Sequence, residues 1–538
     1  MVKQLRPGKG IIRKTKSNAK QLQLALCCGV FALVTLACSI GVLTPDDPIF
    51  TPPGNPWESM VTPVLIFPTD RPLATEGGAP IGGGGLPEES FATPTPYLED
   101  STIRLYDSQA GDTLPVVAVR FAVDVSEITS PVDPLPGESL LPPHTLLIIP
   151  NKLANTTSQQ KILPDSELVY SPSAVDFDIE GYVNQAGGYL STYREWLGTT
   201  QWTTGADVVA RIALENSINP RLLLALLEYQ SGIVLGQPED FAKRDYPMGM
   251  IDLSRKGLYK QLTWAVNHLS VGFYGWREGL LTEIQFSDGA TARLAPDLNA
   301  GTVALQYYLS FVYDTPGWVE ALNNETGLPA VYEQMFGNPW ARAMEVEPLY
   351  PPDLTQPHLI LPFLLGQRWS YTGGPHGAWE HDGARAAIDF APGSTESGCV
   401  DSTAWLVAMA PGLVVRTGHG VIVQDLDGDG LEQTGWVLLY LHVSKIQVKV
   451  GDWVEMSDLL GHPSCEGGTA TGTHVHLARK YNGEWIPADG PLPFILSGWQ
   501  AHAGLEPYQG TLTRASETVY ASIYGSHESL IARQRDDP

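Results

Sequence analysis

Two histidines that stand two residues apart, His474 and His476, constrain this chain most, because its 538 residues contain only 12 histidines. Turn-forming glycines and threonines precede the pair at residues 467–472, and Val475 and Leu477 alternate with the histidines. This alternation after a turn predicts a β-strand. In a strand, side chains i and i+2 point to the same face. Both imidazoles are therefore expected to face one cleft.

An aspartate in an apolar segment adds a second element of the same site. Asp389 lies in residues 386–392, which otherwise read as an apolar strand. A carboxylate buried in such a strand is costly unless it is paired or bound to a metal. A catalytic zinc ion needs three protein ligands of N or O type and one open position. One histidine of the pair can supply a ligand, and the other can serve as a base.

These residues resemble the signature of the lysostaphin-like and beta-lytic zinc endopeptidases of bacterial cell walls, which have an early His and Asp pair and a late His-x-His. The resemblance covers residues 355–500. Arg385 stands where the short form of the signature has its first histidine. The beta-lytic branch takes that histidine from a Gly-Gly-x-His loop, here Gly373-Gly374-Pro375-His376. The resemblance implies one zinc per chain, bound by His376, Asp389 and His476, with His381 as the alternative to His376.

The resemblance also implies roles for two further histidines. Tyr440-Leu441-His442 matches the strand that carries the second catalytic histidine of these enzymes. Two neutral imidazoles and one carboxylate would leave the zinc site at net +1, which suits it to polarise a peptide carbonyl and lower the pKa of bound water toward ~7. His474 is then expected to act as the general base. His442 would stabilise the oxyanion or protonate the leaving amine. The alternative is that all of these are structural histidines.

The cysteines fit an oxidising compartment. Apart from the three in the N-terminal apolar segment, the chain has only Cys399 and Cys465. Outside the cytoplasm they are expected to pair. Such a disulfide would stabilise the fold by ~4 kcal/mol on the chain-entropy account. The alternative is two buried free thiols.

An acidic segment resembles the first half of a calcium-binding loop. It contains Asp425, Asp427 and Asp429, with Gly428 and Gly430 between them. The glutamate expected at position 12 of such a loop is absent, since Trp436 stands there. Calcium is therefore one interpretation of this segment, and a solvated acidic turn is the other.

The N-terminal 43 residues read as an export signal or a membrane anchor. Basic residues precede an apolar segment at 24–43, which is just long enough to span a bilayer. Cys38 resembles the lipid-attachment cysteine of a lipoprotein, although Thr35 stands where leucine is usual. Residues 44–100 are rich in Pro, Gly and Thr and should form a mobile tether. The protein is thus expected outside the cytoplasm or in the cell envelope, held to the membrane by its N-terminal segment or a lipid.

Residues 101–151 resemble a lysin motif (LysM), a βααβ module that binds glycans containing N-acetylglucosamine. The resemblance rests on the turn Gly111-Asp112-Thr113 and on the closing strand that ends at Ile149-Pro150. An insertion at residues 131–139 departs from the motif, as does Pro143-His144 where glycine is expected. The resemblance implies that the Gly-Asp-Thr turn lies at the sugar-binding groove.

After a connecting segment at residues 152–202, residues 203–345 become helical and resemble the lysozyme-like fold of lytic transglycosylases. In that family a buried helix ends in Glu-Ser-Gly, and the glutamate is the general acid. This chain has Gln230-Ser231-Gly232, and glutamine cannot supply the proton. Glu228 lies two residues earlier, about 200° around the helix, and cannot replace it. The segment is expected to bind or position glycan without cleaving it, unless Gln230 is merely structural.

The predicted fold is therefore multidomain α+β, with a LysM-like module, an all-α lysozyme-like domain, a C-terminal antiparallel β peptidase domain, and a tail at residues 501–538. A net charge of −26 argues against nucleic acid as a partner. The predicted function is hydrolysis of peptide bonds in peptidoglycan by an exported zinc metalloendopeptidase. The alternatives are a non-enzymatic regulator of other wall hydrolases and a glycan-cleaving enzyme that acts through the helical domain.

Overall fold

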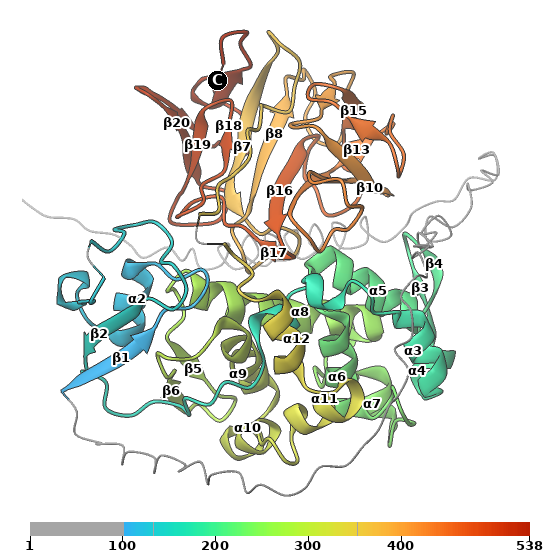
Figure 1. Cartoon of the computed structure of the whole chain (residues 1–538). Helices are drawn as coiled ribbons and strands as arrows, with labels where there is room; N and C mark the ends of the chain where they lie inside the picture. Colours follow the sequence, from blue (N-terminus) through green and yellow to red (C-terminus); the bar gives the residue numbers. More distant parts are fainter. Residues whose placement is uncertain (1–101, 133, 352, 538) are drawn as a thin grey trace, which may run out of the picture. The chain divides into compact units, whose positions relative to one another are not determined.

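A computed structural model describes residues 102–132, 134–351 and 353–537 of the chain (Figure 1). The predicted export signal or anchor, its Cys38 and the whole Pro/Gly/Thr-rich tether lie outside the described residues. Within the described ranges, no helix combines the length and the apolar character needed to cross a bilayer.

The N-terminal part is a small strand pair that encloses one helix. Strands β1 (Ile103–Asp107) and β2 (Leu146–Pro150) pair antiparallel, and α2 (Leu114–Phe121) lies between them in sequence. Thr113 caps α2 by accepting a hydrogen bond from the backbone N–H of Val116. The second helix expected here is a single 3₁₀ turn, Val125–Glu127. The observed order is therefore strand, helix, 3₁₀ turn, strand, and identity with a LysM module stays a prediction.

The helical part follows in sequence (Figure 1). Its central helix α6 starts where Asn219 caps it and Pro220 occupies the first turn, and it ends at Gly232 with φ 64°. The leucines of α6 are fully buried against the surrounding helices. The helices are α3 (Ile179–Ala186), α4 (Tyr189–Thr192), α5 (Gly205–Asn216), α6 (Pro220–Ser231), α7 (Phe241–Asp245), α8 (Leu258–Arg277), α9 (Ala300–Val312), α10 (Thr315–Ala321), α11 (Leu328–Phe336) and α12 (Pro339–Val346).

Two short hairpins accompany these helices. Strands β3 (Arg194–Leu197) and β4 (Gln201–Thr204) form the first, immediately before α5. Strands β5 (Glu283–Gln285) and β6 (Thr291–Arg293) form the second, between α8 and α9. The first hairpin lies in the segment that the sequence suggested was only a connection.

The C-terminal β part contains a nine-stranded antiparallel sheet in the order β14-β10-β11-β12-β16-β8-β7-β22, with β17 paired to β16. Its strands are β7 (Arg368–His376), β8 (Ala387–Pro392), β10 (Gly412–Gly418), β11 (Val421–Asp425), β12 (Trp436–Leu441), β14 (Trp453–Val454), β16 (Val475–Tyr481), β17 (Glu484–Trp485) and β22 (Leu530–Ala532). A three-stranded sheet adds β9 (Leu406–Val407), β13 (Val443–Ser444) and β15 (Leu459–Pro463).

The residues expected to form a C-terminal tail belong to the β part instead. Strands β18 (Ile495–Leu496), β19 (Trp499–Ala503), β20 (Gly510–Arg514) and β21 (Glu517–Tyr520) form a four-stranded sheet. Strand β22 then pairs with β7, which places Ile531 opposite Trp369 in the core. The apolar residues of this segment alternate in the strands, so their burial explains why the domain continues past residue 500.

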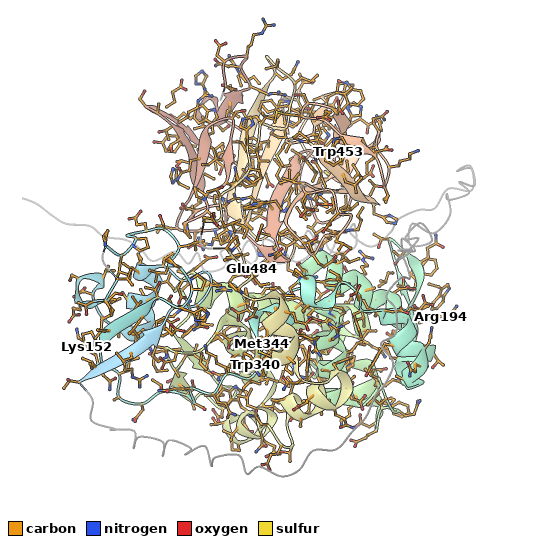
Figure 2. The ribbon with its side chains drawn as sticks, viewed as in Figure 1. Lys152, Arg194, Trp340, Met344, Trp453 and Glu484 are labelled. Carbon is orange, nitrogen blue, oxygen red and sulfur yellow. A yellow bond between two sulfur atoms is a disulfide. The ribbon has the colours of Figure 1, made fainter. Side chains whose placement is uncertain are left out.

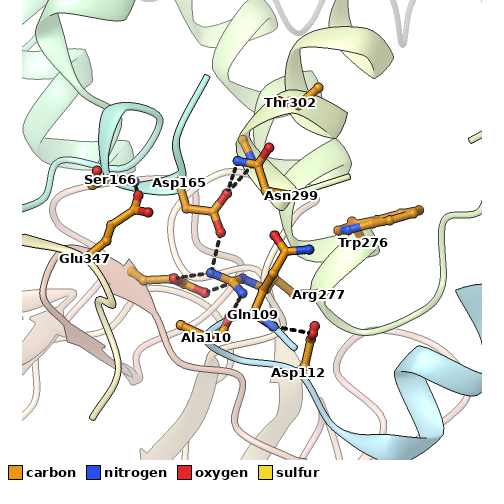
Figure 3. A network of polar contacts seen from close by, with 12 residues as sticks. Gln109, Ala110, Asp112, Asp165, Ser166, Trp276, Arg277, Asn299, Thr302 and Glu347 are labelled. Atoms are coloured by element: carbon orange, nitrogen blue, oxygen red, sulfur yellow. Dashed lines mark hydrogen bonds and ion pairs between the residues drawn. The ribbon is translucent and has the colours of Figure 1, made fainter. Parts of the chain in front are cut away.

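A buried polar network joins the N-terminal, helical and β parts (Figure 3). Arg277, at the end of α8, donates to the carbonyl of Ala110 and pairs with Asp165 at 2.9 Å and with Glu484 of β17 at 3.2 Å. Asp165 also accepts a hydrogen bond from Asn299 at 2.7 Å. Figure 2 places Glu484 where the sheet meets the helices. One cation therefore satisfies acceptors from three separate stretches of the chain.

Candidate metal centre

The register of three neighbouring strands brings His376, Asp389 and His476 together. In the pairing of β8 with β16, Asp389 stands directly opposite His476. On the other side of β8, Gly373 stands opposite Asp389, and His376 lies at the end of β7 after two irregularities in that pairing. A Cβ at position 373 would lie 2.5 Å from Asp389 Oδ2, so only glycine lets β7 pass this carboxylate. The expected strand is present as β16, which begins at Val475, so His476 lies in the strand and His474 immediately before it. Both imidazoles face Asp389.

Backbone carbonyls fix the proton on the far side of two of the imidazoles. His376 Nδ1 lies 2.8 Å from the carbonyl oxygen of Gly374, and His476 Nε2 lies 2.9 Å from that of Ala378. A carbonyl oxygen can only accept, so each of these nitrogens carries the hydrogen. His376 Nε2 and His476 Nδ1 are then bare in the neutral rings. This arrangement is how metal-binding histidines are commonly oriented.

The two bare nitrogens and one carboxylate oxygen converge on the same small volume. His376 Nε2 and His476 Nδ1 are 3.0 Å apart, and they lie 3.3 and 3.2 Å from Asp389 Oδ1. This oxygen is buried and has no hydrogen-bond partner among the described residues. Three acceptors that face one another repel unless a cation lies between them. The set of two imidazoles and one carboxylate therefore fits a divalent metal, and zinc accepts these ligands.

Electrostatics favours a charged Asp389 and a neutral His476, as a metal requires, whereas His376 attracts a proton when no cation is bound. Burial raises the pKa of Asp389, but the imidazoles around it, that of His376 foremost, hold it well below its ordinary value. Burial also lowers the pKa of His476. The pKa of His376 is raised, because attraction by Asp389 outweighs the effect of burial. A bound cation would take the place of the proton that His376 otherwise attracts.

His442 and His474 stand beside this group and outside the ligand triangle. Their ring centroids are 4.5 Å apart, and His474 Nε2 lies 3.8 Å from Asp389 Oδ2. His442 Nδ1 donates to the carbonyl of Glu466 at 2.8 Å, and His474 Nδ1 donates to that of Gly472 at 2.7 Å. The pKa of His442 is lowered to about 4, mainly by burial. In both residues Nε2 is the atom left to exchange a proton.

The alternative first ligand, His381, lies outside this group of three ligand atoms, although it borders the same pocket. Its side chain is 85% exposed and contacts Asp382 at 3.9 Å. Arg385, which replaces the histidine of the short signature, donates instead to the carbonyls of Gly504 and Leu505. The structure therefore brings His376, and not His381, into the group that could hold a metal.

Tyr508 is a neighbour of the site that the sequence did not reveal. Its ring stacks on that of His376 with the centroids 4.0 Å apart. It lies in the loop before β20, which Arg385 ties back through the carbonyls at residues 504 and 505. No motif marks this tyrosine, because the loop is more than a hundred residues away from His376 in sequence.

A groove of about 1980 Å³ opens over the candidate centre. The five histidine and aspartate side chains line it, together with the loop at residues 393–404 and the glycine-rich loop at 467–473. The helical part contributes to the same groove through Thr199, Arg211, Tyr259 and Thr263. The wall opposite the β part is therefore built from residues that the sequence did not connect with the site.

The structure contains the predicted disulfide between Cys399 and Cys465. Next to it, Thr473 donates its backbone N–H to the carbonyl of Gly398 at 3.1 Å, and its hydroxyl oxygen accepts from the backbone of Val400 at 2.8 Å. These hydrogen bonds attach the loop at 393–404 to the residue before His474, and the bridge attaches it to Cys465. One wall of the groove is thus fixed to the strand that carries the histidine pair.

The three carboxylates of the acidic loop lie within 4.8 Å of one another, and they also accept hydrogen bonds from the loop itself. Asp425 accepts hydrogen bonds from the backbone N–H groups of Asp427, Gly428 and Gly430. Asp429 accepts from the backbone of Leu431 and from the hydroxyl of Thr434. These hydrogen bonds explain the acidic residues as caps of a turn, and calcium binding at this loop is not supported.

The residues expected to bind glycan in the N-terminal part make internal contacts. Asp112 is fully buried and accepts from Tyr106 Oη at 2.6 Å and from Arg120 at 2.7 Å. Thr113 caps α2, and Gly111, with φ 87°, packs against the guanidinium of Arg277. These contacts explain the Gly-Asp-Thr turn structurally. Glycan binding at this turn remains a prediction.

Gln230 also has a partner within the helical part. Its amide lies 2.9 Å from the hydroxyl of Tyr308. Glu228 accepts hydrogen bonds from the backbone N–H groups of Val234 and Leu235, both at 2.9 Å, and so holds the segment after α6. These contacts support the interpretation of Gln230 as a structural residue. The Glu228 carboxylate is likewise engaged in internal hydrogen bonds.

Comparison with known proteins adds independent observations. A family model described as the LasA N-terminal domain matches residues 161–350. Protease LasA of Pseudomonas aeruginosa is 27% identical over 345 residues, which is 61% of this chain and 75% of that protein. The family model covers most of the helical region. The predicted likeness of this region to lysozyme remains a prediction.

Two further relatives match a smaller share of the chain. Lysostaphin of Staphylococcus simulans is 29% identical over 140 residues, 24% of this chain and 26% of that protein. Beta-lytic metalloendopeptidase of Achromobacter lyticus is 26% identical over 163 residues, 29% of this chain and 41% of that protein. Among solved structures, the M23 metalloprotease pseudoalterin from the deep sea is 25% identical, with a TM-score of 0.26, over 31% of this chain and 96% of that one.

The resemblance to the lysostaphin-like and beta-lytic endopeptidases is thus confirmed: the chain is a homologue of protease LasA, lysostaphin and beta-lytic metalloendopeptidase.

Proposed function

We propose that this protein is an exported zinc metalloendopeptidase that hydrolyses peptide bonds in peptidoglycan. The observation that carries the proposal is the convergence of His376 Nε2, Asp389 Oδ1 and His476 Nδ1 at 3.0–3.3 Å from one another, with the N–H groups of both imidazoles turned outward. The homology with a protease and a metalloendopeptidase supports the same chemistry. Export is supported by the basic and apolar N-terminal sequence.

The three convergent residues would hold the zinc ion, which supplies Lewis-acid activation of a peptide carbonyl and of water. His474 Nε2 is positioned to accept the proton of the attacking water, because its Nδ1 is committed to the carbonyl of Gly472. His442 Nε2 is positioned to face the oxyanion or to pass a proton to the leaving amine, since its Nδ1 is committed to Glu466. No covalent intermediate is required.

The groove supports an extended polymer as the substrate. It runs from the candidate centre to residues of the helical part, so it is longer than a single peptide bond requires. We assign residues 355–537 to the peptidase domain and residues 203–345 to a helical domain that positions glycan without cleaving it. The contact between Gln230 and Tyr308, in place of a free acid, supports this division of roles. The LysM-like module at 101–151 is a further candidate for attachment to the wall.

The experiment that tests the function separates peptide cleavage from glycan cleavage. Full-length protein, supplied with zinc, is incubated with purified peptidoglycan, and new primary amines and new reducing ends are both measured. We expect amines to appear and reducing ends to stay at background, and His474→Ala to abolish the amine signal. Reducing ends without amines would favour a glycosidase. Neither product, with zinc bound, would favour the non-enzymatic regulator.

A further inference from the structure

The hairpin of β3 and β4 carries two tryptophans that contact each other and lie outside the hydrophobic core. Trp196 and Trp202 are direct cross-strand partners, so both rings lie on one face of the hairpin. They remain 58% and 66% exposed, with their ring centroids 5.8 Å apart at 81°. Exposed aromatic residues of this size, paired on one face, mark binding surfaces more often than folding cores.

The opposite face of the hairpin explains how it is held. The Glu195 carboxylate accepts a hydrogen bond from the backbone N–H of Tyr259 at 2.7 Å, at the start of α8. Next to β3, the hydroxyl of Tyr193 accepts from the N–H of Leu258 at 3.2 Å. Thr203, opposite Glu195, is buried. Since the inner face anchors the hairpin, the outer tryptophan pair is not needed for its attachment.

A chain of contacts connects this hairpin with the catalytic groove. Thr199, in the hairpin turn, lines the groove together with His376. Arg211 donates to the hydroxyl of Thr199 at 2.6 Å and to Glu215 at 2.8 Å, and its guanidinium lies 4.8 Å from the centre of the Tyr259 ring. Arg211 and Tyr259 are themselves groove residues. The surface is therefore continuous from the candidate metal centre to the hairpin, which stands at the edge of the helical part in Figure 1.

We propose that the Trp196–Trp202 hairpin binds the glycan strand of peptidoglycan while the groove holds the attached peptide, an inference that rests on the proposed function. The C–H faces of a pyranose ring pack on aromatic rings, and its hydroxyls need polar partners nearby. The hairpin offers both, because Thr199, Thr200 and Gln201 lie between Trp196 and Trp202 in the sequence. Two tryptophans present a surface of about 150–250 Å² each, well short of the roughly 800 Å² per partner that a stable protein interface buries. The area therefore suits a sugar chain better than a protein partner.

Binding is tested with full-length protein, apart from catalysis. The protein is pelleted with purified sacculi in the presence of a metal chelator, so that no turnover is needed. We expect Trp196→Ala/Trp202→Ala to bind about tenfold more weakly, which corresponds to about 1.4 kcal/mol. Trp453→Ala is the matched control, because Trp453 is 52% exposed on β14, outside the described residues that line the groove, and it should pellet like wild type. A soluble N-acetylglucosamine oligomer should compete with the sacculi for wild type.

Further variants and substrates keep the result open to refutation. Trp196→Phe/Trp202→Phe retains aromatic faces and should recover most of the binding. With zinc restored, the ratio of hydrolysis rates on sacculi and on a glycan-free soluble peptide should fall about tenfold in the double alanine variant. Equal pelleting of this variant and wild type would overturn the inference, as would competition by stem peptide and not by the oligomer. If wild type cleaves neither substrate, the proposed function fails, whereas the pelleting result still decides glycan binding.

Discussion

Replacing His474 should distinguish its role as the general base from the role of the metal ligands next to it. His474 Nε2 lies 3.8 Å from Asp389 Oδ2, outside the triangle of 3.0–3.3 Å formed by the three convergent atoms. His474→Ala should therefore keep its metal and lose the proton acceptor for the attacking water. A positioned base contributes about 10²–10⁴-fold in rate, which corresponds to about 2.7–5.4 kcal/mol in the activation barrier. His476→Ala removes one ligand and should lose metal and activity together.

The assay measures kcat/KM on a soluble peptide and the zinc content of the same samples. His381→Ala is the control, because this exposed histidine lies outside the metal group, and it should keep both zinc and activity. If His474→Ala loses zinc while His476→Ala keeps it, the two roles are exchanged and the reasoning from hydrogen-bond donors is refuted. If His381→Ala loses zinc and His376→Ala does not, the first ligand has been misassigned.

Three further predictions concern stability, measured by chemical denaturation of the full chain. Arg277→Ala should lower the free energy of unfolding by about 3–5 kcal/mol, because it leaves the buried carboxylates of Asp165 and Glu484 without their cation. An unchanged denaturation midpoint would show that the network in Figure 3 does not stabilise the fold. Burial raises the pKa of Glu432, but Arg416 and Lys480 lower it to about 2. The ionised carboxylate therefore contributes about 3 kcal/mol to the free energy of unfolding above pH 4.5, and this contribution is lost as the pH falls toward 2. Glu432→Gln should flatten this acid dependence, and a stability profile parallel to that of wild type would contradict the prediction. Replacing both Cys399 and Cys465 by serine should cost about 4 kcal/mol, from closure of a loop with a sequence separation of 66, and no loss would exclude the bridge as a stabilising element.

The strand that carries the histidine pair could be predicted because its evidence is local. Alternation of His474, Val475, His476 and Leu477 after a turn fixes which side chains share a face, whatever the rest of the chain does. Asp389 could be chosen for a similar reason, as a charge in an apolar strand. The choice of His376 depended on a resemblance, because only the pairing of β7 with β8 brings it next to Asp389.

The parts that the sequence did not reveal depend on tertiary contacts. Tyr508 reaches His376 because Arg385 and the strands after residue 500 hold its loop in place. Trp196 and Trp202 gain significance only from their cross-strand register and their exposure. The second LysM-like helix failed to form because prolines and glycine crowd the insertion at residues 131–139, leaving only the 3₁₀ turn before it.

The most direct test of the central claim is the zinc content of the purified full chain after reconstitution and removal of loosely bound metal. The account predicts one zinc per chain in wild type and in His474→Ala, and a loss of zinc in His376→Ala, Asp389→Ala and His476→Ala. A wild-type protein that binds no zinc under these conditions, or a His476→Ala variant that still holds one equivalent, would contradict the assignment of the metal centre.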